Sequence, residues 1–322
     1  MAKAFSFRGN DSVGAMVEDR LVKAGYDRVT DAGAASVSLT YFTSQQDLED
    51  AYFDDGGLVQ EAKAGSILID LSPTTPTFAR ELNAVATVND LAVVEAPLIV
   101  SNPVIPDAFG PKGNVSCFAA GDEEHMKLAA PVLEDLFGEV RVIGAPGAAQ
   151  LARAAYTLQA SAQIVSVIEA DALYRAVRRS QPVPQESEFR TGAATTLAEE
   201  VLAAVGSSAF DGSSTVEMLM AELTAALGAA DDADLILPQA EACMHLLELL
   251  SVIGGSDKNP AALSLAYREE EECAAAGLDW SRAEEAYGHL GGRDDDDDDY
   301  GFGAEGGDPD DPCDGYPGYS AN

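Results

Sequence analysis

The longest stretch without a helix-breaking residue lies in the middle of this 322-residue chain, between Gly147 and Pro182. A continuous helix of some 30 residues would be about 45 Å long. From Ala148 to Ile168 its only charged residue is Arg153, so we expect a helix that is buried almost all round. The chain before it alternates strand-like and helix-like patterns, and the chain after it is largely helix-like. The segment therefore predicts a long helix between two domains, with a single buried guanidinium that needs a partner.

Length and composition indicate a soluble protein with two domains. The chain is long enough for two cores, and its apolar fraction of 47% is ordinary for globular proteins. The N-terminus has no basic leader followed by an apolar core, so we expect no signal peptide and a cytoplasmic location. Residues 148–168 could span a membrane by length, but they carry Arg153 and three glutamines, which favours a buried helix.

The chain is strongly acidic. It has 55 acidic and 19 basic residues, a formal net charge of −36, which disfavours binding to nucleic acid. The four cysteines have no pair spacing and the three histidines do not cluster with them, so we expect neither a metal site nor a disulfide framework. Residues 291–322 are rich in Asp, Gly and Pro, and we expect a disordered acidic tail there.

The order of the patterns predicts an α/β domain followed by an all-helical one. Strand-like segments lie at 4–7, 37–42, 67–71, 91–100, 114–119 and 141–143. Helix-like segments separate them, which favours a mostly parallel sheet. Only ten residues separate Tyr26 from the strand at Val37, whereas a strand-helix-strand unit needs about 30, so the first half of the sheet should be shortened. Further helices are expected at 196–205, 216–229, 238–252 and 260–275.

The first strand runs into a glycine-punctuated turn and a helix. Gly9 and Gly14 match the outer glycines of the G-x-G-x-x-G pattern of dinucleotide-binding turns, but Asp11 stands at the middle position. A carboxylate there adds bulk and negative charge where two phosphates should lie. Two interpretations stay open, a weakened cofactor turn that includes Asn10 and Ser12, or a strand-helix turn without a ligand.

Asp31 is the only acid near the position that would hold a ribose 2′-hydroxyl. Its spacing from Gly14 fits that role roughly. An ordinary solvated loop acid is the alternative, and the sequence does not decide between them.

Several longer segments carry a family resemblance. They read IDLSPTTPTFAREL, EAPLIV, AAGDEEHMKLAAPVLEDL and VIGAPGAAQLARAAYTLQ up to the long helix, and VEMLMAELTAALGAA, LILPQAEACMHLLELL and GGSDKNPAALSLAYREEE after it. In this order and spacing the chain resembles the β-hydroxyacid dehydrogenases, the family of 3-hydroxyisobutyrate dehydrogenase and of the 6-phosphogluconate dehydrogenase NAD(P)-binding domain. The resemblance covers about residues 3 to 290.

The resemblance implies a fold and an activity. It implies a Rossmann-like NAD(P)-binding domain over residues 1–145, and an interdomain helix with a helical dimerisation and substrate domain over 146–290. The implied activity is hydride transfer between NAD or NADP and a small hydroxyacid or related anion. The implied partners are a small anionic metabolite and a second copy of the chain, in a homodimer or larger homo-oligomer.

The catalytic positions that the resemblance marks are changed in this chain. Arg153 stands where the family has its acid/base lysine, and Thr157 stands where the family has an asparagine. Arginine stays protonated at working pH, so it can orient a carboxylate or stabilise an alkoxide but cannot take a proton. Two roles for Arg153 stay open, an interdomain salt bridge and an anchor for an anionic ligand. The second-domain lysine position is Ala221, next to Glu222.

The family's substrate loop is changed as well. Its Ser-Gly-Gly triplet falls on Ile99, Val100 and Ser101, which leaves Ser101 and the following Asn102 as candidate substrate-binding residues. Ser72 matches the serine of the family's Asp-x-Ser-Thr loop near the nicotinamide, and an ordinary loop serine is the alternative. The sequence therefore supports two hypotheses, a divergent NAD(P)-dependent oxidoreductase and a catalytically inactive relative that serves as a binding or regulatory scaffold.

Overall fold

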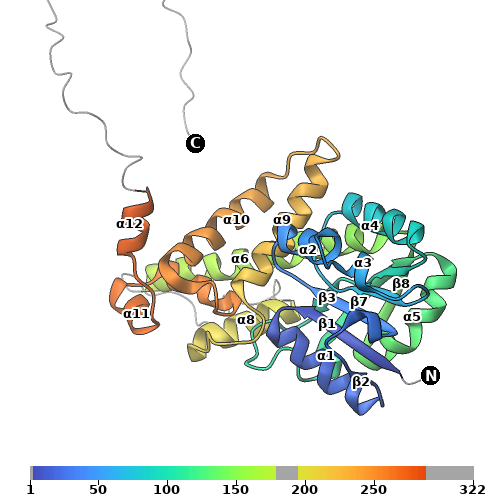
Figure 1. Ribbon diagram of the computed structural model, residues 1–322. Helices are drawn as coiled ribbons and strands as arrows, with labels where there is room; N and C mark the ends of the chain where they lie inside the picture. The colour runs from blue at the N-terminus through green and yellow to red at the C-terminus, as the bar shows by residue number, and fades with distance from the viewer. Residues whose placement is uncertain (1–2, 179–194, 288–322) are drawn as a thin grey trace, which may run out of the picture.

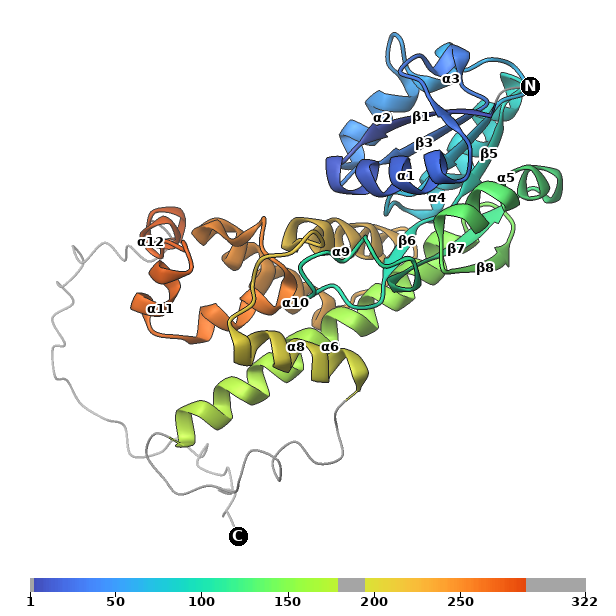
Figure 2. The same ribbon diagram turned by 90° about the horizontal axis from the view of Figure 1, so that it is seen from below.

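The computed structural model describes residues 3–178 and 195–287. They form a sheet domain and a helical domain joined by one long helix, α6 (Ala148–Arg178) (Figures 1 and 2). This is the Rossmann-like α/β and then all-α architecture that the sequence predicts. The acidic tail expected at 291–322 lies outside the described residues.

One mixed sheet forms the first domain. Its strands are β1 (Ala4–Gly9), β2 (Asp27–Arg28), β3 (Val37–Tyr41), β4 (Ile67–Asp70), β5 (Ala92–Glu95), β6 (Leu98–Val100), β7 (Val115–Gly121) and β8 (Glu139–Gly144). They lie in the order β2-β1-β3-β4-β5-β7-β6, and β8 pairs with β7. The strands from β2 to β5 pair in parallel, while β7 runs antiparallel to β5 and β6.

The shortened first half of the sheet is confirmed. The two-residue strand β2 pairs with one edge of β1, and β3 pairs with the other edge. The chain between them holds a single 3-10 turn, η1 (Ala32–Ala34), in place of a crossover helix. The sheet therefore lacks the additional strand and helix that usually extend this side.

The expectation of one strand over 91–100 is wrong. The structure has two strands, β5 and β6, separated by Ala96 and Pro97. Proline has no backbone N–H for a sheet ladder, so the run breaks there. β6 then pairs antiparallel with β7 and carries the chain toward the second domain.

Helices cover the sheet on both faces. They are α1 (Asp11–Lys23), α2 (Gln45–Phe53), α3 (Leu58–Glu61), α4 (Pro76–Val88) and α5 (Glu123–Leu136). Two groups of buried side chains hold them to the sheet, one that includes Val13, Val17 and Leu133, and one that includes Leu48 and Leu82.

Helix α6 is not buried almost all round, contrary to the prediction. Leu151 and Leu173 have exposed fractions of 61% and 64%, whereas Ile164 and Ile168 are buried against the helical domain. Ala155, Gln159 and Ser166 are exposed as well, so a helix with few charges does not need burial on every side. Among the described residues, none of the helices, α6 included, is apolar over a long enough window to cross a bilayer.

The second domain packs around α6. It contains α8 (Thr196–Ser207), α9 (Val216–Asp231), α10 (Pro238–Leu250), a π-turn at Ser251–Gly255, a 3-10 segment η4 (Pro260–Tyr267), α11 (Glu270–Ala275) and α12 (Ser281–Tyr287). The single helix expected over 260–275 is wrong, because Arg268 adopts an extended backbone (ψ 170°) between η4 and α11. Leu219, Leu247 and Leu263 are among the residues of this domain's core.

Candidate functional site

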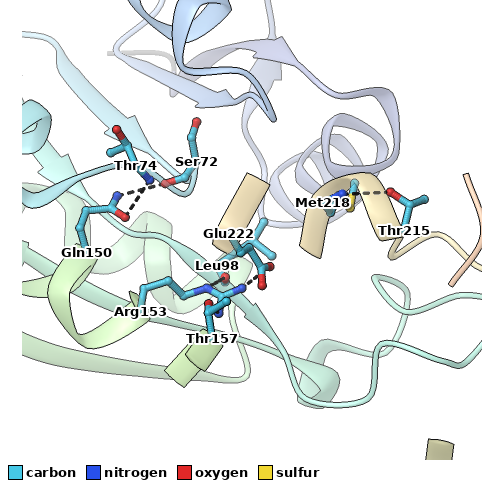
Figure 3. A network of polar contacts seen from close by, with 9 residues as sticks. All are labelled: Ser72, Thr74, Leu98, Gln150, Arg153, Thr157, Thr215, Met218 and Glu222. Atoms are coloured by element: carbon cyan, nitrogen blue, oxygen red, sulfur yellow. Dashed lines mark hydrogen bonds and ion pairs between the residues drawn. The ribbon is translucent and has the colours of Figure 1, made fainter. Parts of the chain in front are cut away.

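Arg153 and Glu222 meet between the two domains (Figure 3). Arg153 lies on α6 with 4% of its side chain exposed, and its Nη2 forms an ion pair with Glu222 of α9. Its Nε donates to the carbonyl oxygen of Leu98 at 2.8 Å, and its Nη1 donates to the hydroxyl of Thr157 at 2.6 Å. Every guanidinium nitrogen therefore has a protein partner, and the salt bridge that the sequence left open is present.

Thr157 completes a three-residue network. It lies one helical turn after Arg153 on α6 and is fully buried, and its hydroxyl also hydrogen-bonds the Glu222 carboxylate. Burial raises the pKa of Glu222, while Arg153 and the hydrogen bonds from Arg153 and Thr157 oppose that shift. Glu222 is thus held in place by two residues of α6 and is easier to protonate than a free glutamate.

A pocket opens beside this network. Its empty space of about 410 Å³ includes the open solvent at its mouth. Its polar lining consists of Arg153, Glu222, Ser214 and the ring of Tyr156, which lies 5.3 Å from the Arg153 guanidinium carbon. The remaining lining residues are apolar or proline: Val100, Pro103, Ala160, Ile164, Leu197, Leu219 and Pro260.

The predicted substrate loop lies next to this pocket. Ser101 is exposed, and its backbone N–H donates to Asn114. The Asn102 side chain accepts from the Val104 N–H at 3.2 Å and hydrogen-bonds Glu200 of α8. Their neighbours Val100 and Pro103 line the pocket, so the loop presents mainly apolar surface to it.

The turn between β1 and α1 requires glycine at both of the predicted positions. Gly9 has φ 125°, and a Cβ there would lie 1.9 Å from the Tyr41 carbonyl oxygen, so only glycine fits. A Cβ on Gly14 would lie 2.8 Å from the Phe7 ring, so this glycine lets α1 pack closely on β1. Both outer glycines therefore serve the tight turn that the pattern requires.

The start of α1 is less suited to phosphate. The Asn10 side chain accepts hydrogen bonds from the N–H groups of Ser12 and Val13, two of the donors that a helix N-terminus offers to an anion. Asp11 is exposed in the first turn. The turn therefore keeps its shape but presents a negative charge.

Asp31 and Ser72 are both used within the protein. The Asp31 side chain caps the 3-10 turn η1 by accepting from the Gly33 N–H at 2.8 Å. The Ser72 hydroxyl accepts from the Phe42 N–H at 3.0 Å, and the Ser72 carbonyl accepts from Gln150 of α6 (Figure 3). Ser72 thus ties the end of β4 to β3 and to the start of the interdomain helix.

Two buried carboxyl groups lie at the ends of β4 and β5. Glu95 accepts hydrogen bonds from the N–H groups of Gly147 and Ala149 at 2.7 and 3.1 Å, so it caps α6. Burial raises the pKa of Glu95 to about 7, and burial raises that of Asp70 to about 6. Sequence reasoning missed both acids, although each directly ends a run of apolar strand residues.

The start of α9 closes the edge of the sheet where β1 and β3 end. Met218 is 4% exposed and belongs to the hydrophobic core of the sheet domain. Glu217 accepts from the Thr43 hydroxyl, just after β3, at 2.8 Å. Tyr41 ends β3, and its pKa is raised by burial and, to a lesser degree, by Glu222. The domains are therefore in contact where Rossmann-like folds bind their cofactor.

The residues of the candidate site that sequence reasoning missed are the partners of Arg153. Glu222 was expected only as the neighbour of the lysine position, and Tyr156 was not singled out. The available signal was the isolated charge itself, because a buried guanidinium requires a carboxylate and Glu222 is the only charged residue of α9 away from its two ends. Within residues 3–178 and 195–287 no group of three or more His, Cys, Asp or Glu side chains could hold a metal ion.

The sequence is similar to known oxidoreductases. Residues 8–144 match the NAD binding domain of 6-phosphogluconate dehydrogenase. The NAD-dependent L-serine dehydrogenase of Pseudomonas aeruginosa is 27% identical over 53% of this chain and 64% of its own length. A probable mitochondrial 3-hydroxyisobutyrate dehydrogenase-like protein of Arabidopsis thaliana is 30% identical over 36% of this chain. The match spans only 37% of that relative.

Solved structures share the fold. A 3-hydroxyisobutyrate dehydrogenase from Salmonella typhimurium superposes with a TM-score of 0.67 at 20% identity, over 82% of this chain and 99% of its own. The 3-hydroxyisobutyrate dehydrogenase of Mycobacterium tuberculosis, solved with L-serine, gives a TM-score of 0.63 at 17% identity. That match covers 84% of this chain and all of the other.

Proposed function

Because the chain is a divergent member of the β-hydroxyacid dehydrogenase family, we propose that it is an NAD(P)-dependent oxidoreductase that uses Glu222 for proton transfer. The observation that carries the proposal is the Arg153–Glu222 pair beside the interdomain pocket. It lies where the family resemblance places the acid/base lysine. The substrate would be a small molecule in that pocket, and small hydroxyacids are the reference class for the test.

Glu222 suits proton transfer better than Arg153 does. Arginine keeps its proton at any working pH, whereas a partly buried carboxyl group with a raised pKa can give and take one. Arg153 and Thr157 fix its position through the ion pair and the shared hydroxyl. Its side chain is 15% exposed and lines the pocket, so a bound hydroxyl or amino group could reach it. In this proposal Arg153 is a positioning residue.

NAD or NADP fits the turn of the sheet domain in backbone geometry, although Asn10 occupies two of the N–H donors at the start of α1. The turn at Gly9, the start of α1 and the loop after β4 would hold the dinucleotide at the edge where β1 and β3 end. The nicotinamide ring supplies or accepts the hydride when it is bound. Asp11 opposes the pyrophosphate charge, so the affinity should be weak.

A catalytically inactive scaffold is the second candidate. The contacts of Met218 and Glu217 with the sheet domain favour it, because they close the edge at which a cofactor would enter. A cofactor would then have to displace the start of α9. The two candidates differ in whether the closed edge opens for a nucleotide.

A titration separates these candidates. Purified protein is titrated with NADH and with NADPH while the nicotinamide fluorescence is followed. Saturable binding of either cofactor supports the oxidoreductase, and no binding of either at millimolar concentration overturns it in favour of the scaffold. Titrations with AMP and with nicotinamide mononucleotide, the two halves of the dinucleotide, identify which half of the site binds its ligand.

Activity tests the role of Glu222. With saturating cofactor, Glu222→Gln should lower kcat at least about a hundredfold, the usual size of a lost general acid or base, and leave the cofactor affinity unchanged. Glu241→Gln is the matched control, since it removes an exposed acid from the neighbouring helix α10. A Glu222→Gln enzyme with the wild-type pH profile and kcat would remove Glu222 from the mechanism.

A further inference from the structure

We propose that a small cavity between α4 and the sheet binds a dehydrated monovalent cation, Na⁺ or K⁺, through Glu95, Asn83 and Asp70. The inference goes beyond the proposed function, because it holds whether or not the chain binds a dinucleotide. The cavity is lined by α4, the ends of β4, β5 and β7, and Pro146, which precedes α6. It has room for about one water-sized particle.

Two buried oxygen atoms at this cavity have no hydrogen-bond partner in the described part of the chain. They are Glu95 Oε2 and Asn83 Oδ1. Glu95 is 4% exposed, and its other oxygen, Oε1, already accepts from the N–H groups of Gly147 and Ala149. Both free oxygens are acceptors, so the group that satisfies them must be a donor or carry a positive charge.

The two acids at this cavity are stabilised by hydrogen bonds and not by a cationic side chain of the described residues. Burial raises the pKa of Glu95 and Asp70 raises it further, while backbone N–H groups around the start of α6 lower it. Burial also raises the pKa of Asp70, and hydrogen bonds from Ser72 and Thr40 lower it. A buried carboxylate needs a positive partner, and a small cation supplies one here.

The ligands favour a monovalent ion over a divalent one. Asp70 is already compensated, because its Oδ1 accepts from the Thr40 hydroxyl at 2.9 Å and from the Ser72 N–H at 3.0 Å. The unbalanced charge is therefore that of Glu95 alone. Carboxylate and amide oxygens suit hard cations, but Ca²⁺ takes roughly six to eight oxygens and Mg²⁺ keeps several waters, for which this cavity has no room. The net charge of −36 concentrates cations around the protein.

Three other arrangements would satisfy the same oxygens without an ion. Glu95 could hold a proton, the Asn83 amide could turn so that its NH₂ group donates to Glu95, or an ordered water could donate to both. Each of them makes stability independent of the size of the cation in solution. The proposed site makes stability depend on it, because only a small cation enters the cavity.

Unfolding in different salts tests the inference without a cofactor. Urea unfolding is followed at about pH 8, where Glu95 is ionised, in NaCl, KCl or tetramethylammonium chloride, each at about 0.5 M so that screening is equal. Tetramethylammonium is too large for the cavity. We expect Na⁺ or K⁺ to lower the unfolding equilibrium constant at least about tenfold relative to tetramethylammonium, and to do so saturably as one salt replaces the other.

Matched variants separate this site from general salt effects. Glu95→Gln should lose most of the difference between the salts, while Glu124→Gln, which removes an exposed acid from α5, should keep it. Asn83→Met removes one ligand and fills the cavity, so it should lose the difference too, and it replaces Glu95→Gln if that variant does not fold. Equal stability of the wild type in all three salts overturns the inference, as does a difference that persists undiminished in Glu95→Gln or Asn83→Met.

Discussion

Arg153 and Glu222 form a buried ion pair that joins the interdomain helix α6 to α9 of the helical domain. A residue change that alters only one partner leaves the other charge uncompensated inside the protein. The pair therefore links the chemistry of the site to the contact between two helices.

Breaking this pair on one side should be costly, and removing both partners should not be. We expect Arg153→Met and Glu222→Leu each to lower the free energy of unfolding by about 3–5 kcal/mol, and the double variant to lie within about 1–2 kcal/mol of wild type. Urea unfolding followed by the fluorescence of Trp280, the single tryptophan, measures these values. The exposed pair Lys127–Glu123 is the control, worth less than about 0.5 kcal/mol. Additive losses in the double variant would show that the pair is not coupled.

Asp11 should limit the affinity for NADH and NADPH. Replacing it by Asn removes the negative charge and replacing it by Gly also removes the bulk, so we expect both to tighten binding, by up to about tenfold for Gly. The fluorescence titration gives the affinities. Glu124→Gln is the control, since Glu124 lies in the first turn of α5, which follows the antiparallel strand β7 and so begins at the other edge of the sheet. Unchanged NADH and NADPH affinity in both Asp11 variants would show that the cofactor phosphates do not bind at the start of α1.

Gly9 and Gly206 should respond oppositely to alanine. Gly9→Ala should lower the free energy of unfolding by more than about 3 kcal/mol, because φ 125° is strained for alanine and its Cβ would meet the Tyr41 carbonyl. Gly206 lies within α8 and a Cβ there meets nothing within 4 Å, so Gly206→Ala should raise stability by about 0.5–1 kcal/mol. Circular dichroism during urea unfolding measures both. A loss of less than about 1 kcal/mol in Gly9→Ala would mean that the turn can change its backbone conformation to accommodate alanine.

Local sequence patterns predicted most of the fold, because helix and strand formation depends mainly on residues that are close together in the chain. The 31-residue helix α6 follows from the absence of breakers. The break between β5 and β6 was missed, although proline at position 97 cannot donate to a ladder. The 3-10 segment η4 was predicted as part of one α-helix, because its apolar spacing also suits a helix that continues past Arg268. The spacing of apolar residues does not distinguish one continuous α-helix from a 3-10 segment followed by a separate helix.

The site was harder to predict because its members are far apart in the chain. The sequence marked Arg153 and Thr157, which are one turn apart on α6, but it did not pair Arg153 with Glu222, 69 positions later. It also did not indicate that Asn10 caps the N–H groups that a phosphate would use. Long-range pairing depends on how the domains pack, and no local pattern records that.

Glu95 should make the protein more stable at mildly acidic pH. Its pKa rises from an ordinary value near 4.5 to about 7 on folding, mainly through burial. Between these values the folded state holds a proton that the unfolded state has released, so the free energy of unfolding falls as pH rises from about 4.5 to 7. Asp70, with a pKa of about 6, acts in the same direction at lower pH. Glu95 should account for about 2–4 kcal/mol of this loss.

Glu95→Gln tests this assignment, because glutamine keeps the acceptor for the Gly147 and Ala149 N–H groups and does not titrate. Urea unfolding at a series of pH values between 4.5 and 8 should give a flatter profile for this variant than for wild type, with the difference in slope concentrated between about pH 4.5 and 7. Exposed acids also destabilise the folded state as pH rises, through their mutual repulsion, so Glu124→Gln serves as the reference and should keep the wild-type slope. Parallel profiles for wild type and Glu95→Gln would mean that Glu95 is already ionised at pH 5 and that the repulsion of the surface acids sets the slope.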